Sequence, residues 1–138
     1  MERAITDSRK ISMMKKFLTI SLVVVIVGLS IFILFRYFFV FGEGVKAGEL
    51  NYVVKKGYIF KTYEGKLIQS GLRSRSPGTV QSYEFEFSIS NEAVAQKLML
   101  SSGKIVELHY KEYIGTLPWR GYSNFVVDSI VAITEPGK

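Results

Sequence analysis

Residues 17–35 form a run of nineteen residues without a charge, FLTISLVVVIVGLSIFILF. With a rise of about 1.5 Å per residue, roughly 20 helical residues cross the hydrocarbon core of a bilayer. In lipid, only a helix satisfies every backbone polar group within one segment. The run has no polar stripe of the kind that a core helix in a soluble protein shows. It therefore predicts a transmembrane helix, which we extend over residues 17–41 because aromatic residues follow Arg36.

A cleaved signal peptide is the main alternative to a permanent anchor. Its apolar region spans about 7–15 residues and precedes a cleavage site of small residues. Here the run is longer and bulky aromatic residues follow it, which favours an uncleaved signal anchor. Five basic residues and two acidic residues precede the run. The positive-inside rule then predicts a cytoplasmic tail at 1–16 and an extracytoplasmic domain at 42–138, in the cytoplasmic (inner) membrane.

The formal charge of +6 is concentrated near this run. Residues 1–41 hold six Lys/Arg and two Asp/Glu, whereas residues 42–138 hold twelve and ten. A basic flank of this kind interacts with anionic headgroups, so we expect the lipid bilayer as a partner and no nucleic acid. The chain has no cysteine and one histidine, which argues against a disulfide, a thiolate nucleophile or a zinc site. We expect no metal and no cofactor.

The residues after the apolar run predict a joint and then strands. Gly42-Glu43-Gly44 predicts the end of the helix and a flexible connection. Beyond it the hydrophobic pattern has a period of two, with Leu50, Tyr52 and Val54 on one face of the first strand. A bulge or kink that lets the strand curve is expected at Glu64-Gly65, and residues 70–79 have the composition of a loop. The predicted strands are residues 46–54, 58–69, 80–90, 104–113 and 124–134.

One short helix is expected between the third and fourth strands. Asn91 is a suitable N-cap, and Gly103 is expected to end the helix in a left-handed conformation. Three strands, a helix and two strands are the order of an OB-fold, a five-stranded Greek-key barrel. We therefore predict an all-β domain, a small OB-like barrel after a single transmembrane helix. Other small barrels and an open α+β sheet remain as alternatives.

Three segments resemble a family of short, single-pass bacterial membrane proteins without an established function. They are GEGVKAGELNYVVKKGYIFKTYEGKL, FSISNEAVAQKL and VELHYKEYIG. The family pattern is G-E-x-x-x-G, then K-G, then K-T-x-E-G. It falls on Gly42, Glu43, Gly48, Lys56, Gly57, Lys61, Thr62, Glu64 and Gly65.

The resemblance covers most of residues 42–133 and implies a location and an architecture. Some members carry an automatic label of 6-phosphogluconate dehydrogenase. We reject that activity for this chain, because it is too short, begins with a membrane run and lacks a dinucleotide-binding fingerprint.

The KTYEG segment is the first candidate for chemistry. Lys61 and Tyr63 are two residues apart and are expected on one face of a strand, with Glu64 beside the bulge. A lysine and a carboxylate in the mouth of a barrel could bind an anion or transfer a proton. The alternative is a surface ion pair beside a glycine that the curvature of the strand requires.

His109 is expected on the solvent side of its strand, with Glu107 and Lys111. A catalytic triad of Ser129, His109 and Asp128 is conceivable from the residue types, but no motif or spacing supports it. We expect no catalytic residue here.

The segment YIGTLPWRGY, residues 113–122, is the most distinctive loop. Tyr113, Trp119, Arg120 and Tyr122 combine aromatic faces with a cation, the residue types enriched at binding hot spots. The corresponding loop of an OB-fold borders the ligand surface. As alternatives, Trp119 plugs the barrel or dips into the headgroup layer.

We expect a non-enzymatic interaction module that binds an envelope protein or serves as a small subunit of a membrane complex. Binding of a glycan or an anionic lipid across the KTYEG face is the alternative, and an enzyme using Lys61 and Glu64 is the least favoured.

Overall fold

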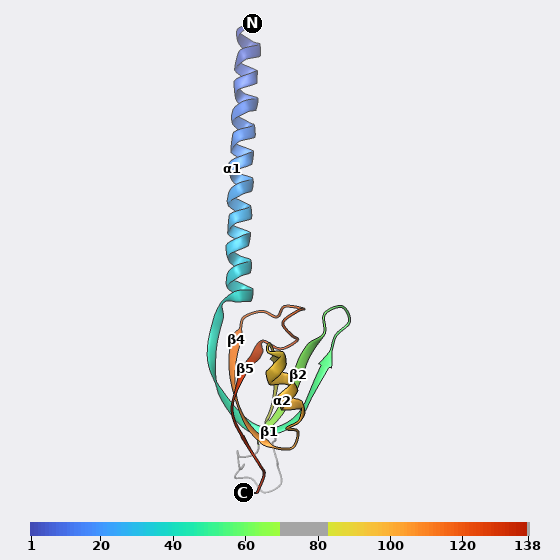
Figure 1. The fold of residues 1–138 in the computed structure, drawn as a ribbon. Coiled ribbons are helices and arrows are strands. Elements are labelled where there is room, and N and C mark those ends of the chain that lie inside the picture. The colour runs from blue at the N-terminus through green and yellow to red at the C-terminus, as the bar shows by residue number, and fades with distance from the viewer. Residues whose placement is uncertain (70–82, 138) are drawn as a thin grey trace. The chain divides into compact units, whose positions relative to one another are not determined.

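The structure is a computed structural model that describes residues 1–69 and 83–137 (Figure 1). The chain divides into two compact units, one of residues Met1–Phe38 and one that begins at Phe39. The first unit is the helix α1 (Glu2–Phe38). The second contains five strands and a short helix. These elements are β1 (Val40–Lys56), β2 (Thr62–Gln69), β3 (Tyr83–Ile89), α2 (Glu92–Met99), β4 (Ile105–Tyr113) and β5 (Phe125–Thr134).

Helix α1 is long and apolar enough to cross a membrane, with a mean hydropathy of 2.9 over its most apolar window. The hydroxyls of Thr19 and Ser30 donate to the carbonyl oxygens of Lys15 and Ile26, four residues earlier. These bonds satisfy two hydroxyls of the apolar run without breaking the helix. The helix also includes almost all of residues 1–16 and ends at Phe38. The predicted end at residue 41 is therefore wrong.

The joint predicted at Gly42-Glu43-Gly44 is also wrong, because these residues belong to β1. Gly42 lies opposite Glu112 and Gly44 lies opposite Tyr110 on β4. A Cβ atom on Gly44 would lie 3.2 Å from the hydroxyl oxygen of Tyr110. Glycine therefore permits close packing of the tyrosine ring on the strand, rather than a flexible connection.

The five strands form one sheet that closes on itself. The hydrogen-bonded order is β1-β2-β3-β5-β4, and β4 pairs with β1. Four of the five pairings are antiparallel, and β3 with β5 is parallel. The long strand β1 makes closure possible, because residues 40–49 pair with β4 and residues 49–56 pair with β2. Every strand therefore has two partners, although β3 and β5 pair only at Ser88 with Val126 and at Ile89 with Val127.

A bulge in β1 corrects the predicted face of the first strand. The pairing with β2 is irregular between Leu50 and Tyr52. The extra residue shifts the alternation by one, so Leu50 and Val53 are buried while Tyr52 and Val54 are partly exposed. The bulge predicted at Glu64-Gly65 is wrong, since β2 pairs with β3 in regular register there.

Gly65 has a packing role instead. A Cβ atom at this position would lie 2.5 Å from the ring of Phe87, which is fully buried in the core. Phe85 and Ile89 are buried beside it, as the alternation of β3 predicts. Residues 58–61, predicted as the start of the second strand, form the turn before β2. The predicted loop 70–79 and the predicted start of the third strand at 80–82 lie outside the described residues.

Helix α2 begins as predicted. The side chain of Asn91 accepts hydrogen bonds from the backbone N–H groups of Ala93 and Val94. The helix ends earlier than expected, with Leu100 as its right-handed C-cap. Gly103 has a φ of +82° but follows the helix, and its N–H donates to the carbonyl oxygen of Leu50. The predicted cap at Gly103 is therefore wrong, and the glycine instead joins the turn to β1.

Candidate functional site

A buried carboxylate fastens the loop between β4 and β5 to the sheet. Glu64 on β2 is buried, and its carboxylate accepts hydrogen bonds from the hydroxyls of Thr62, at 2.7 Å, and Ser88, at 2.6 Å. It also accepts from the backbone N–H of Tyr122 at 3.0 Å. A buried charge is tolerated when several donors face it. Glu64 is thus the centre of a network that crosses β2, β3 and the loop.

Ser88 on β3 extends this network. Its hydroxyl oxygen accepts a hydrogen bond from the backbone N–H of Ser123 at 3.0 Å. The hydroxyl of Ser123 in turn donates to the carbonyl oxygen of Glu86, also at 3.0 Å. Tyr122 and Ser123 are therefore held on the sheet by three hydrogen bonds.

This arrangement requires glycine at residue 121. Gly121 has a φ of +146°, and a Cβ atom there would overlap the hydroxyl of Ser88. The N–H groups of Arg120 and Gly121 both donate to the carbonyl oxygen of Leu117, which is itself buried. The loop residues 117–123 are thus hydrogen-bonded both to one another and to the sheet, and we call this segment the platform.

The platform borders a groove of about 620 Å³. Three strands, β1, β2 and β3, supply one wall, and the loop with the start of β5 supplies the other. Glu64 and Gly65 line it together with the exposed side chain of Tyr122, and Lys56 lies over the Tyr122 ring at 5.6 Å. The volume lies in the range of small-ligand pockets, about 300–1,000 Å³.

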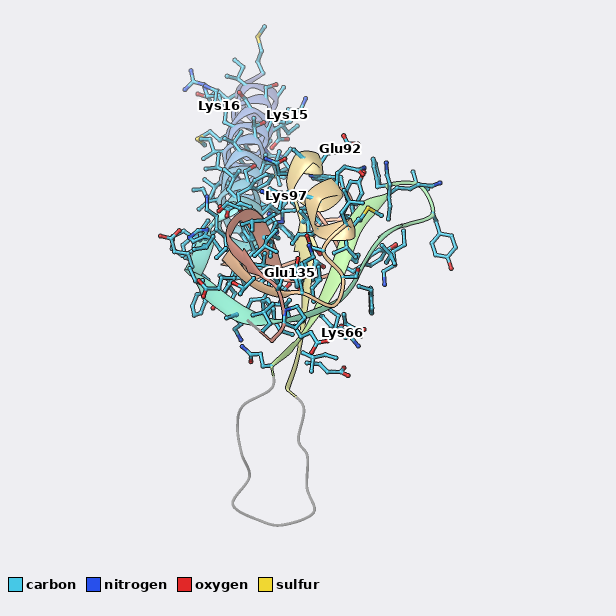
Figure 2. The ribbon with its side chains drawn as sticks, turned by 60° about the horizontal axis from the view of Figure 1, so that its bottom comes forward. Lys15, Lys16, Lys66, Glu92, Lys97 and Glu135 are labelled. Atoms are coloured by element: carbon cyan, nitrogen blue, oxygen red, sulfur yellow. The ribbon has the colours of Figure 1, made fainter. Side chains whose placement is uncertain are left out.

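Charged side chains mark the part of the groove that β3 lines. Glu84 and Glu86, both exposed, lie 2.9 and 3.1 Å from the ammonium nitrogen of Lys66. Lys66, labelled in Figure 2, projects from β2 on this face of the sheet. Hydrogen bonds to the two carboxylates raise the pKa of Lys66. Lys66 is therefore held between two carboxylates that line the groove, with the ring of Tyr52 at 6.0 Å from its ammonium.

The residues predicted in the 113–122 loop fall into separate roles. The guanidinium of Arg120 stacks 3.7 Å from the ring centre of Tyr113 and donates to the carbonyl oxygen of Gly115 at 2.6 Å. Burial lowers the pKa of Arg120, although the nearby Tyr113 opposes that shift. These two side chains support the loop from within, while Tyr122 faces the groove. Trp119 is directed elsewhere, with its ring 6.1 Å from that of Phe60 in the β1–β2 turn.

The KTYEG residues do not share one surface. Lys61 is exposed just before β2, whereas Tyr63 is buried in the core. The hydroxyl of Tyr63 donates to Glu92 at the start of α2 and accepts from Gln96, so it fixes the helix to the sheet. Glu64 is bound to Thr62, Ser88 and the loop. Of the three predicted residues, only Glu64 lines the groove.

His109, Asp128 and Ser129 do come together on β4 and β5, but in the wrong order for nucleophilic catalysis. The Nδ1–H of His109 donates to Asp128 at 2.7 Å, and Ser129 donates to the same oxygen at 3.1 Å. The serine thus bonds the carboxylate rather than the imidazole that would have to activate it. The Nε2 atom of His109 lies 4.0 Å from the carboxylate of Glu43. His109 is partly buried, not the fully solvated histidine that its strand face predicts.

Metal binding finds no support among residues 1–69 and 83–137. No group of three or more His, Asp or Glu side chains in these ranges is placed to hold an ion. The negative charge of Glu64 is met by hydrogen-bond donors instead.

Sequence reasoning missed Ser88 and Gly121, which the groove requires. Ser88 alternates with Glu84 and Glu86 on the outer face of β3, so its pattern predicts a solvent-exposed residue. It is buried because residues 121–123, more than thirty positions later, cover it. A weak signal was available in the Arg120-Gly121 pair, since a glycine directly after a turn often marks a positive φ.

Comparison with known proteins adds no relative, because no family model, no curated protein and no solved structure matches the chain. The resemblance to short bacterial membrane proteins therefore stays an expectation.

Proposed function

We propose that this chain is a single-pass membrane protein whose exported β-domain binds a segment of an envelope protein, without catalysing a reaction. The observation that carries the proposal is the groove beside the β4–β5 loop, whose backbone is fastened by Glu64 and Ser88. A rigid platform loses little conformational entropy on binding, which favours recognition of a partner.

The strand order supports an OB-like identity for the domain. An OB-fold has five strands in a Greek-key barrel, with a ligand surface on strands two and three between two loops. Here the sheet closes in the order β1-β2-β3-β5-β4, with α2 between β3 and β4. The groove lies on the corresponding strands and next to the corresponding loop.

Anchoring by α1 supports binding in the envelope. A tether in the membrane raises the effective concentration of the domain toward partners in the same plane. The basic residues before the apolar run favour a cytoplasmic N-terminus and an exported domain. We place the protein in the cytoplasmic (inner) membrane on this ground.

The chemistry of the groove favours a polypeptide. Its lining alternates aromatic rings, such as Tyr52 and Tyr122, with carboxylates and amides, such as Glu84 and Asn124. Such a lining matches the mixed polar and apolar surface of a peptide segment. An anionic lipid fits this groove poorly, because Glu84 and Glu86 stand on its rim.

A photoreactive amino acid in place of Tyr122, in the full chain in its host cells, tests the proposal. We expect one protein adduct, and its yield should fall when Tyr52 is replaced by alanine. The matched control carries the photoreactive residue at Val131, an exposed position on β5. Absence of an adduct from Tyr122, or equal adducts from both positions, would contradict the proposal.

Binding of a glycan in the same groove is the second candidate, since tyrosine rings also stack on sugars. Retention of the full chain on immobilised envelope glycans that is lost in Tyr122→Ala, with no protein adduct from a photoreactive residue at position 122, would favour the glycan.

A further inference from the structure

A second surface of the β-domain is formed by the turn between β1 and β2 and by Trp119. Tyr58 is fully exposed, Ile59 is 87% exposed, and Phe60 is half exposed. Trp119 is 58% exposed although its ring contacts that of Phe60. Consecutive large apolar side chains at a turn are uncommon on soluble proteins, where exposed apolar patches mark interaction sites. We call these four residues the aromatic tip.

Basic residues flank the aromatic tip. Lys55, Lys56 and Lys61 are exposed on both sides of the turn. Residues 50–63 contain no carboxylate, and residues 113–127 contain none either. The carboxylates that border these two ranges are Glu49, Glu64, Glu112 and Asp128. Glu64 is buried, and the exposed charged side chains between residues 55 and 61 are all lysines, so the exposed charge at the turn is positive. Exposed aromatic residues between lysines match the chemistry of an anionic lipid surface.

The aromatic tip lies at the end of the β-domain where the chain enters it. Val40, the first residue of β1, pairs with Tyr113, the last residue of β4, and the loop with Trp119 follows directly. Figure 1 shows the start of β1, this loop and the β1–β2 turn at one end of the sheet. A single residue, Phe39, separates the end of α1 from β1. If α1 spans the bilayer, the chain at Val40 emerges at the membrane surface.

We propose that the aromatic tip docks on the headgroup layer of the anionic leaflet from which β1 emerges. Trp119, Tyr58 and Phe60 would insert their rings at the interface, as aromatic residues do at both ends of membrane spans. The three lysines would lie among the lipid phosphates. Two attachments, α1 and the tip, would then fix the orientation of the domain and leave the groove accessible from the side. The inference rests on the proposed anchoring by α1, but not on the proposed partner of the groove.

The chain offers a direct probe, because Trp119 is its only tryptophan. The full chain is placed in nanodiscs of phosphatidylethanolamine and phosphatidylglycerol, with and without bromine on the acyl chains. We expect brominated lipid to reduce Trp119 emission, because the docked indole would lie at the boundary of headgroups and acyl chains. Quenching by aqueous iodide should be correspondingly weak.

Two variants and one control separate docking from chance proximity. Ile59→Glu places a carboxylate at the tip and should restore iodide quenching while abolishing quenching by brominated lipid. Replacing Lys55, Lys56 and Lys61 together by glutamine should weaken lipid quenching. Leu100→Glu alters a residue that is 85% exposed before β4, away from the loop that follows β4, and should change neither measurement.

The outcomes distinguish the inference from the anchor on which it rests. If the wild-type chain stays in the discs while iodide, and not brominated lipid, quenches Trp119, the docking is overturned and the anchor stands. If neither quencher acts, Trp119 is covered by protein and docking on lipid is overturned. Equal lipid quenching in purely zwitterionic discs would overturn the anionic assignment. A chain that does not enter the discs at all would contradict the anchor itself.

Discussion

At the scale of single residues, Glu64 has the strongest influence on the candidate site. Its buried carboxylate joins two strands to a loop that lies 58 residues further along the chain. A buried hydrogen-bonded carboxylate of this kind holds a backbone in place, and it needs no catalytic role to be indispensable. The presence of a carboxylate in KTYEG can be read from the sequence, but its partners cannot, because they come from distant positions.

Replacing Glu64 by glutamine should destabilise the β-domain by about 1–3 kcal/mol. The hydroxyls of Thr62 and Ser88 and the N–H of Tyr122 bond the two carboxylate oxygens of Glu64, whereas an amide offers one acceptor oxygen. Urea unfolding of the full chain in detergent, followed by Trp119 fluorescence, measures this loss. Glu86→Gln is the matched control, since this exposed carboxylate pairs with Lys66 and should cost about 1 kcal/mol or less. Equal losses in the two variants would contradict the role assigned to Glu64.

Asp128 gives the β-domain a pH dependence. Burial raises the pKa of its carboxyl, but hydrogen bonds from His109 and Ser129 and the charges of His109 and Lys111 outweigh burial and lower it. A lowered pKa in the folded state stabilises the protein above the unfolded value, about 3.9, and this stability is lost as the pH falls through the folded value.

The stability difference between the wild type and Asp128→Asn should therefore shrink as the pH is lowered from 6 to about 3. We expect a difference of about 1 kcal/mol or less at pH 6, because the site is partly exposed. The urea midpoint of both proteins across this range measures it. A difference that does not change with pH would show that the carboxylate is not held as described.

At the scale of elements, the sequence predicts most strands and the start of α2, but it does not predict the bulge or the residues that a distant loop covers. The burial of Phe85, Phe87 and Ile89 on one face of β3 and the N-cap Asn91 follow from local signals, and both are confirmed. The bulge in β1 and the burial of Ser88 depend on closure of the sheet and on a distant loop, so no local pattern reveals them. Gly42 and Gly44 have the composition of a linker, but they lie in β1. Because they lack side chains, Glu112 and Tyr110 of β4 can pack against the strand there.

The loop between β4 and β5 depends on Gly121 for two reasons that can be measured separately. Gly121→Ala should cost about 1–2 kcal/mol for the positive φ and about 1–3 kcal/mol more for overlap with Ser88. Gly103→Ala is the control, because its φ is also positive but open space surrounds it. Thermal unfolding of both variants gives the comparison. Equal losses would mean that the loop can move away from Ser88 at little cost.

At the scale of the whole molecule, the chain consists of an apolar helix and a closed sheet that has two distinct surfaces. The groove beside Tyr122 and the aromatic tip with Trp119 use different side chains of one loop, and Arg120 stacked on Tyr113 supports the loop between them. In the proposed arrangement, the membrane holds one surface and leaves the other for a partner. All of these proposals require α1 to cross the bilayer and the β-domain to be exported.

Labelling of single cysteines tests this requirement most directly, because the natural chain has none. Ser8→Cys reports on the N-terminal residues of α1, and Leu100→Cys reports on an exposed position of the β-domain. Intact spheroplasts are treated with a maleimide that cannot cross the membrane. The account predicts rapid labelling at Leu100→Cys and labelling at Ser8→Cys only after lysis. Labelling of Ser8→Cys alone in intact spheroplasts, or of neither position before lysis, would contradict it.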